Sequence, residues 1–229
     1  MGQRAHIDVR LRCAERSGNE RNPLNKLAEI HGASTSAQDY FQAYTDRLTS
    51  LLNVLDKDAI AATIDAIEAC SQRGNTLFSM ANGGSAASAS HLVNDLVAGC
   101  YLDDKPKLRT LCLTDNVATV TALGNDAGFD HIFSHQLRVH MRPGDVVLAM
   151  SVSGNSENLI QAVDYANAHG ATTIGYAGFD GGRLAERCKI SVVIPTSKDE
   201  YGPVEDVFNI LGHVVITYIA MSRGKYLHH

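Results

Sequence analysis

Hydrophobic and polar positions divide the chain into a helical first part and a second part with a shorter period. Between residues 37 and 72, apolar side chains recur every three or four positions, as they do in amphipathic helices. We expect two helices there, the first following the N-cap Ser36 and the second spanning Asp56–Gln72. Residues 1–37 lack this period and are rich in Arg, Asn, Gly and Ser, which indicates a flexible or loosely docked extension.

Beyond residue 75, short continuous apolar runs alternate with helical patterns. The five expected strands are Thr76–Met80, Leu108–Leu113, Asp145–Met150, Thr172–Tyr176 and Ile190–Ile194. The helical patterns that separate and follow them cover Ala86–Val97, Val117–Leu123, Phe133–His140, Glu157–His169 and Pro203–Met221. Continuous apolar strands are typical of a parallel sheet that helices cover on both faces. The sequence therefore predicts one α/β domain over residues 38–222, followed by a polar tail at residues 223–229.

The composition is that of a soluble globular protein. The 229 residues are 45% hydrophobic and 20% charged, which is enough for one full core. The formal net charge of −5 offers no basic footprint, so we expect neither nucleic acid nor membrane as a partner. We identify no signal peptide and no apolar run long enough to span a bilayer.

Cysteine usage points to a reducing compartment. The number of cysteines is odd and no two form a CxxC pair, which argues against a disulfide framework and for a cytoplasmic protein. We expect buried structural thiols at Cys13, Cys70, Cys100, Cys112 and Cys188.

Two loops rich in Ser and Gly each lie between a predicted strand and a predicted helix. They are Asn82-Gly83-Gly84-Ser85 and Ser151-Val152-Ser153-Gly154-Asn155-Ser156. Glycine lets the backbone approach an anion closely, and the following helix N-terminus supplies unpaired N–H groups. Either loop alone is also explained by a tight turn with a capping residue. The presence of both loops at the carboxyl edge of one sheet favours a phosphate site. No P-loop and no dinucleotide-binding glycine motif is present.

Two pairs of potential metal ligands lie on helical patterns. His91 and Asp95 are one turn apart, and Glu205 and His213 are a little over two turns apart, so each pair shares a helix face. Two imidazoles and two carboxylates are a plausible Zn²⁺ set. Either pair alone also fits a surface pair or a packed histidine, and spacing does not join the two pairs.

The two loops, their spacing and the stretch Ala122–Phe129 resemble the SIS (sugar isomerase) domain, in its phosphoheptose isomerase branch, over about residues 38–222. The resemblance implies a three-layer αβα sandwich with a flavodoxin-like, five-stranded parallel sheet. It also implies a homotetramer with active sites shared between subunits, and phosphate held by serines of both loops. The expected substrate- and phosphate-binding residues are Asn82, Gly83, Gly84, Ser85, Asp115, Asn125, Asp126, Ser151, Ser153, Gly154, Asn155 and Ser156.

The resemblance also joins the two pairs of potential ligands. The family has a His and a Glu on the first helix after the sheet begins and a Gln and a His on the last. The matching residues here are His91, Asp95, Glu205 and His213. They are the expected ligands of a divalent metal, identified as Zn²⁺, with Asp95, Glu205 and His213 as the catalytic groups. Asp95 stands where the family has Glu, and Glu205 stands where the family has Gln. We interpret these two differences as a coordinated exchange that keeps the site.

Other departures from the family pattern affect the sugar more than its phosphate. Val152 stands where Thr is usual, Gly202 where Asp is usual, and Gly99-Cys100 where an Arg is common. The family has an acidic residue in the loop after the second strand, and Asp115 is its best match here. Because Asp115 is one position out of register, Asn116 is the alternative match. The sugar is therefore less well specified than its phosphate.

These features predict a metal-assisted aldose–ketose isomerase that acts through an enediol. The best-matching reaction converts sedoheptulose 7-phosphate to D-glycero-D-manno-heptose 7-phosphate or uses a close relative. One alternative is a non-catalytic SIS protein, either a scaffold that binds a replication initiator or a sugar-phosphate sensor. Another is an epimerase or lyase with the same enediol chemistry. Retention of both carboxylates and both histidines favours the enzyme.

Overall fold

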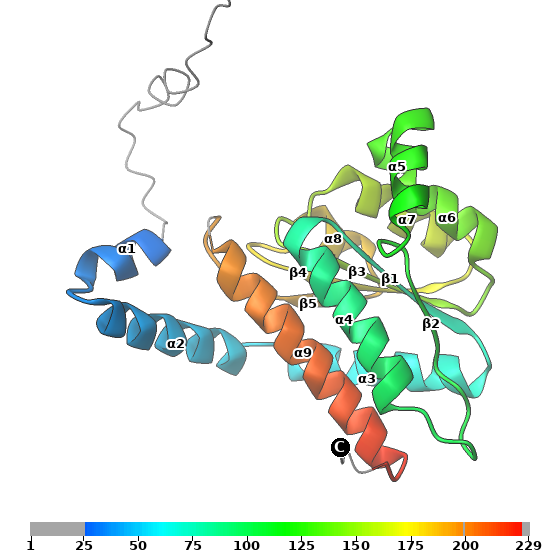
Figure 1. The fold of residues 1–229 in the computed structure, drawn as a ribbon, viewed down its shortest axis with the longest axis horizontal. Coiled ribbons are helices and arrows are strands. Elements are labelled where there is room, and N and C mark those ends of the chain that lie inside the picture. The colour runs from blue at the N-terminus through cyan, green and yellow to red at the C-terminus, as the bar shows by residue number, and fades with distance from the viewer. Residues whose placement is uncertain (1–25, 199, 226–229) are drawn as a thin grey trace, which may run out of the picture.

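A computed structural model describes residues 26–198 and 200–225 and shows a parallel sheet between two layers of helices (Figure 1). The strands are β1 Thr76–Ala81, β2 Arg109–Cys112, β3 Val146–Ser151, β4 Thr172–Ala177 and β5 Ile190–Val193. Their order is β2-β1-β3-β4-β5, and every neighbouring pair is parallel. The predicted α/β sandwich with a five-stranded, flavodoxin-like sheet is confirmed.

The helices divide between the two faces of the sheet. The α-helices are α1 Lys26–Ala33, α2 Ala37–Asn53, α3 Lys57–Gln72, α4 Gly83–Gly99, α5 Val117–Asp126, α6 Ile132–His140, α7 Glu157–Ala168, α8 Gly182–Arg187 and α9 Tyr201–Ser222. A 3₁₀ turn, η2, covers Phe129–His131. Helices α3, α4 and α9 pack together on one face, and α6, α7 and α8 lie on the other (Figure 1).

Alternation along the strands builds a separate core on each face. In β1, Leu77 and Ala81 belong to the core under α3, α4 and α9, whereas Phe78 and Met80 belong to the core under α6 and α7. All of these side chains are buried, because successive side chains of a strand point to opposite faces. Burial on both sides explains why the strands appear in the sequence as continuous apolar runs.

The strand order brings the two Ser-rich loops together. β1 and β3 are neighbours in the sheet, yet their crossovers leave in opposite directions, toward β2 and toward β4. The loops that follow β1 and β3 therefore flank the point where the strand order reverses. Crevices at such points are the usual ligand sites of open parallel sheets.

The ends of the domain differ from the sequence-based expectation. Residues 26–33 form α1 and bury Ile30, so this part of the predicted extension is helical and docked. Residues 1–25 lie outside the described part of the chain. Arg223, assigned to the polar tail, bonds Glu68 of α3 with Nε 2.7 Å from Oε1. The helix α8 was also missed, because it begins with Gly182 and is only six residues long.

Helix α9 corrects the expectation about apolar segments. By length and composition alone it is apolar enough to cross a membrane, with a mean hydropathy of 1.4 over its richest window. Half of that window is buried inside the fold, against α4 and α3. Those properties are also the ones expected of the core helix of an α/β domain.

The described cysteines behave as structural thiols. Cys70, Cys100 and Cys112 are buried, Cys188 is half-buried, and all four are free. Burial raises the pKa of Cys70 and of Cys100 to about 11. These thiols therefore stay protonated at neutral pH, as expected of packing residues. Cys13 lies outside the described residues.

Candidate active site

A cavity of about 300 Å³ opens between the two Ser-rich loops and the first turns of α9. It is lined by Asn82, Gly83, Gly84, Ser85, Met150, Ser151, Val152, Ser153, Ser156, Tyr201 and Glu205. Eight of these eleven residues were predicted as site residues from the sequence. The cavity lies at the carboxyl ends of β1 and β3, where the strand order places it.

The helix α4 presents a free N-terminus to this cavity. Its N-cap is Asn82, yet no side chain caps the helix. The carboxamide of Asn82 instead exchanges two hydrogen bonds with Asn158, at 2.9 and 2.8 Å. The first N–H groups of α4, at Gly83 and Gly84, therefore keep their hydrogen-bonding capacity for a ligand. An uncapped helix N-terminus attracts anions through these N–H groups and the helix dipole.

The helix α7 supplies a second N-terminus of the same kind. Ser156 occupies the N-cap position, but its side chain makes no capping hydrogen bond. Its Oγ lies 3.5 Å from Ser151 Oγ. By contrast, α2 and α3 are capped by the side chains of Ser36 and Asp56. The alternative in which Ser156 serves only as a cap is therefore not the arrangement observed.

Tight packing holds the second loop in shape. Gly154 has a φ of +64°, and a Cβ atom there would lie 2.1 Å from the carbonyl oxygen of Gly181. Its N–H donates to Ser151 Oγ at 3.1 Å. The Asn155 side chain donates to Ser153 O at 2.8 Å and accepts from the Arg183 N–H. Gly154 and Asn155, predicted as ligand contacts, shape the loop but do not line the cavity.

Glu205 brings a carboxylate into the cavity from α9. Ser85 Oγ donates to Glu205 Oε1 at 3.0 Å. A Cβ atom at Gly84 would lie only 2.5 Å from Glu205 Oε2. The carboxylate therefore lies directly on the backbone of the first loop, in space that only glycine leaves open. An acid–base group thus stands beside the candidate phosphate cradle.

Three of the four predicted metal ligands form a compact cluster where α4 packs against α9. His91 Nε2 lies 3.0 Å from Asp95 Oδ2 and 3.1 Å from His213 Nε2, and all three ligand atoms lie within 4.8 Å of one another. Two imidazoles and one carboxylate fit the ligand preference of Zn²⁺. The structure does not bring Glu205 into this cluster, because eight residues of helix separate it from His213 by roughly 12 Å along the axis.

Three predicted substrate ligands lie away from the cavity of their own chain. Asp115, Asn125 and Asp126 are exposed and do not line it. Asn116, the alternative to Asp115, accepts a hydrogen bond from the Thr119 N–H and caps α5. These residues flank or belong to α5, a helix that projects from the body of the domain and has no buried residue (Figure 1).

Three residues that line the cavity, Met150, Val152 and Tyr201, were not predicted as site residues. Tyr201 lines it from the first turn of α9, and its spacing of four residues from Glu205 was the available signal. Its ring meets Phe179 edge-on, with centroids 5.6 Å apart. Phe179 has a φ of +55°, the only positive φ of a non-glycine residue in the described chain. Backbone strain of this kind often accompanies functional sites.

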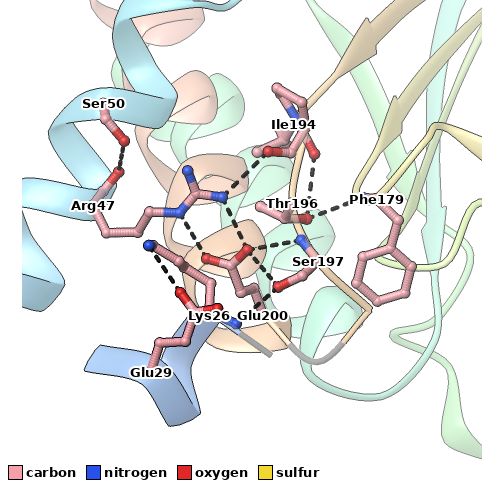
Figure 2. Close-up of polar contacts among 10 residues, drawn as sticks. Lys26, Glu29, Arg47, Ser50, Phe179, Ile194, Thr196, Ser197 and Glu200 are labelled. Carbon is pink, nitrogen blue, oxygen red and sulfur yellow. Dashed lines mark hydrogen bonds and ion pairs between the residues drawn. The ribbon is translucent and has the colours of Figure 1, made fainter. Parts of the chain in front are cut away.

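Helix α2 anchors the start of α9 through a buried ion pair (Figure 2). Arg47 Nε and Nη2 donate to the two carboxylate oxygens of Glu200 at 2.8 and 2.9 Å. Ser197 donates to the same carboxylate through its N–H and its hydroxyl. Glu200 is fully buried. Burial raises its pKa, but the bonds from Arg47 and Ser197 outweigh that effect and hold the pKa below its usual value.

A second contact from α2 fills the space beside Gly202. A Cβ atom on Gly202 would lie 3.1 Å from Tyr44 Oη. That hydroxyl donates to Asp206 Oδ2 at 2.5 Å, and burial together with this bond raises the pKa of Tyr44. The departure from the family pattern at Gly202 therefore accompanies a tyrosine packed against the same turn.

Helix α6 carries two polar residues, His135 and Gln136, that take no part in the candidate site. Gln136 is buried, and its Nε2 donates to the carbonyl oxygens of Leu113 and Ile132. His135 is exposed on the outer side of the same helix. Neither lines the cavity.

Comparisons with known proteins agree with this geometry. Residues 39–178 match the SIS domain family. The chain is 40% identical over 157 residues to a phosphoheptose isomerase of Rhodospirillum rubrum, covering 69% of this chain and 82% of that protein. Among solved structures, it is similar to a phosphoheptose isomerase from Francisella tularensis (TM-score 0.72, 27% identity, 80% of this chain and 96% of the other). Phosphoheptose isomerase GmhA from Neisseria gonorrhoeae has a TM-score of 0.71 and the same identity and coverage.

Proposed function

Because this chain belongs to the phosphoheptose isomerase family of SIS-domain proteins, we propose that it interconverts sedoheptulose 7-phosphate and D-glycero-D-manno-heptose 7-phosphate. The observation that carries the proposal is the pair of helix N-termini without side-chain caps at one cavity, whose lining also includes the Glu205 carboxylate. A dianionic phosphate suits the first feature, and proton transfer at a sugar carbon needs the second.

The phosphate binds between the two loops in this proposal. The N–H groups of Gly83 and Gly84 and the hydroxyls of Ser153 and Ser156 donate to its oxygens, while the Ser85 hydroxyl donates to Glu205. Ser151 is buried and accepts from the Gly154 N–H through its Oγ, and that hydroxyl keeps its own hydrogen to donate. The overall negative charge of the chain is no obstacle, because backbone N–H groups supply the local positive potential.

Glu205 acts as the base that moves a proton between C1 and C2 of the sugar. Its carboxylate lines the cavity and accepts a hydrogen bond from Ser85. That bond holds the carboxylate beside the loop that binds the phosphate. The proton that leaves one carbon returns to the neighbouring carbon of the enediol, which converts ketose to aldose. This assignment follows from Glu205 lying in the cavity, whereas Asp95 lies with the two histidines.

His91, Asp95 and His213 hold a divalent metal, for which Zn²⁺ is the proposed identity. When bound, the metal supplies Lewis-acid polarisation of sugar oxygens. His91 Nε2 and Asp95 Oδ2, which lie 3.0 Å apart, would both bind the ion. Substitution His213→Ala should lower bound zinc, measured by elemental analysis, to the background of a His91→Ala/His213→Ala double variant. Zinc retained at the wild-type amount in His213→Ala would contradict this assignment.

We further propose a homotetramer in which neighbouring subunits complete each site. Support comes from α9, which buries one face within the domain and carries the apolar residues Val214, Tyr218 and Met221 on its exposed face. The α5 helix, with no buried residue, is a further contact surface and would carry Asn125 and Asp126 toward a neighbouring cavity. The free, buried cysteines support a cytoplasmic location.

Turnover of sedoheptulose 7-phosphate tests the function. Purified full-length protein with Zn²⁺ is expected to produce the aldose heptose 7-phosphate, separated from the ketose by chromatography. Glu205→Gln is expected to lower kcat, and Ser153→Ala to raise KM with a smaller effect on kcat. A protein that binds no metal, and that turns over no ketose phosphate even when Zn²⁺ is supplied, would instead support the non-catalytic alternative. Full activity in both Glu205→Gln and Asp95→Asn would overturn the assignment of the chemistry to these carboxylates.

A further inference from the structure

The arginines of the described chain differ sharply in their partners. Eight lie within residues 26–198 and 200–225. Four form ion pairs: Arg47 with Glu200, Arg183 with Glu157, Arg187 with Asp164 and Arg223 with Glu68. Arg138 lies over the Tyr165 ring, 5.1 Å from its centroid. The remaining three, Arg73, Arg109 and Arg142, have no carboxylate partner among the described residues, and all three line one cavity.

This cavity lies at the amino ends of the strands, whereas the candidate active site lies at their carboxyl ends. It has a volume of about 510 Å³ and is bordered by Thr76 and Arg109, the first residues of β1 and β2. The six residues of β1 separate its Thr76 end from the Ser-rich loops by roughly 20 Å. The two cavities therefore cannot hold parts of one small molecule.

The charge lining the cavity is positive although the whole chain is acidic. His140 adds a fourth basic side chain to the three arginines. The one carboxylate of the lining, Asp145, is 3% exposed. Its oxygens accept from the Asn75 amide and the Thr76 N–H at 2.9 Å, and from the Arg142 N–H at 2.6 Å. Asp145 is thus committed to holding the loops. Arg73 Nη2 donates to the carbonyl oxygen of Gly144 at 3.3 Å, and none of the three guanidinium groups is neutralised by a carboxylate of the described residues.

A second groove of about 400 Å³ continues from this cavity along the edge strand β2. The two share Thr76, Arg109 and His140. The groove adds Leu111, which is 40% exposed and lies on the same face of β2 as Arg109. An exposed apolar side chain beside a guanidinium group suits an organic group rather than a bare ion.

We propose that this arginine cavity is a second, non-catalytic binding site for a phosphorylated metabolite of the nucleoside diphosphate class. The diphosphate lies on Arg73, Arg109 and Arg142, because guanidinium forks match phosphate oxygens in pairs. The nucleoside lies along β2, in the groove that contains Leu111 and Thr110. The cavity holds no free carboxylate to serve as a base, so the bound molecule is an effector and not a substrate. The proposal does not depend on the isomerase reaction.

Calorimetric titration of the full chain with inorganic pyrophosphate and with ADP tests this site. Two variants separate the two anion sites: R109M/R142M removes charge from the arginine cavity, and S151A/S153A weakens the Ser-rich cradle. R138M is the matched control, since Arg138 is also exposed but lies outside the cavity. The substituted arginines are exposed, so folding is expected to persist and is checked by circular dichroism.

The expected result is ADP binding in the wild type, in R138M and in S151A/S153A, and a loss of about tenfold or more in affinity in R109M/R142M. ADP is also expected to bind S151A/S153A more tightly than pyrophosphate does, because only ADP reaches the groove. R109M/R142M should keep the wild-type isomerase kcat measured without ADP. Unchanged ADP affinity in R109M/R142M, or binding lost only in S151A/S153A, would overturn the proposal.

Discussion

The Arg47–Glu200 ion pair should be essential to the stability of the site, and replacing Arg47 alone should be far more harmful than replacing both partners. Glu200 is completely buried, whereas the Arg47 side chain is 22% exposed. Arg47→Met removes two charge-assisted hydrogen bonds and leaves the Glu200 carboxylate with donors from Ser197 only. A buried charge without its partner is the expected source of the damage.

The structure sets the size of the effect. Loss of one partner of a buried ion pair costs about 3–5 kcal/mol of the free energy of unfolding. The double variant Arg47→Met/Glu200→Met removes the stranded charge as well, and it should be closer to the wild type than Arg47→Met is. The matched control is Arg187→Met in the exposed pair with Asp164, where the two side chains are 46% and 44% exposed. Such a pair contributes about 0–1 kcal/mol.

Urea unfolding followed by circular dichroism measures these differences, at one protein concentration because assembly also contributes to stability. The start of α9 carries Tyr201 and Glu205, so Arg47→Met should also lower kcat/KM, with partial recovery in the double variant. The reasoning would be refuted by an Arg47→Met variant no less stable than Arg187→Met. It would also be refuted by a double variant whose loss equals the sum of the two single losses.

Three further predictions follow from particular contacts. Gly84→Ala places a Cβ 2.5 Å from the Glu205 carboxylate, a flexible group that can move, so activity should fall strongly while the urea midpoint changes little. Asn158→Leu leaves the Asn82 amide free to cap α4, so KM measured by initial rates should rise more than kcat falls, and unaltered KM would contradict the role assigned to the amide pair. The lowered pKa of Glu200 means that its ionised form stabilises the fold fully above the ordinary pKa of a glutamate, 4.5, and that this contribution is lost as pH falls through the folded pKa. Urea midpoints between about pH 6 and about pH 3 should therefore fall less steeply in Glu200→Gln than in the wild type, and parallel curves would refute the link.

The fold could be predicted because its signals are local. Each strand is a continuous apolar run, and burial between two helical layers requires that pattern. The Ser-rich loops could be placed for the same reason, since each directly follows such a strand. Short elements escaped prediction: α8 has positive-φ glycines at its N-cap, Gly181, and at its first residue, Gly182, and α1 lies in a polar stretch where only Ile30 is buried.

The site was predictable only in part because it depends on contacts distant in sequence. The i,i+4 spacing of His91 and Asp95 showed a shared face, but only the packing of α4 on α9 brings His213 to them. The family resemblance placed Glu205 in that cluster as well, yet the shared face of Glu205 and His213 does not remove their axial separation. The amide pair between Asn82 and Asn158 joins residues 76 positions apart, and no local pattern reveals it.

Deuterium exchange gives the most direct test of the central claim that this cavity moves a proton between adjacent carbons of a phosphorylated sugar. Wild-type protein loaded with Zn²⁺ is incubated with sedoheptulose 7-phosphate in D₂O, and the recovered sugars are examined by proton NMR. We predict deuterium at C1 of the ketose and C2 of the aldose, with exchange greatly slowed in Glu205→Gln. Recovery of the sugar with no deuterium at either carbon from the wild-type protein would contradict the account.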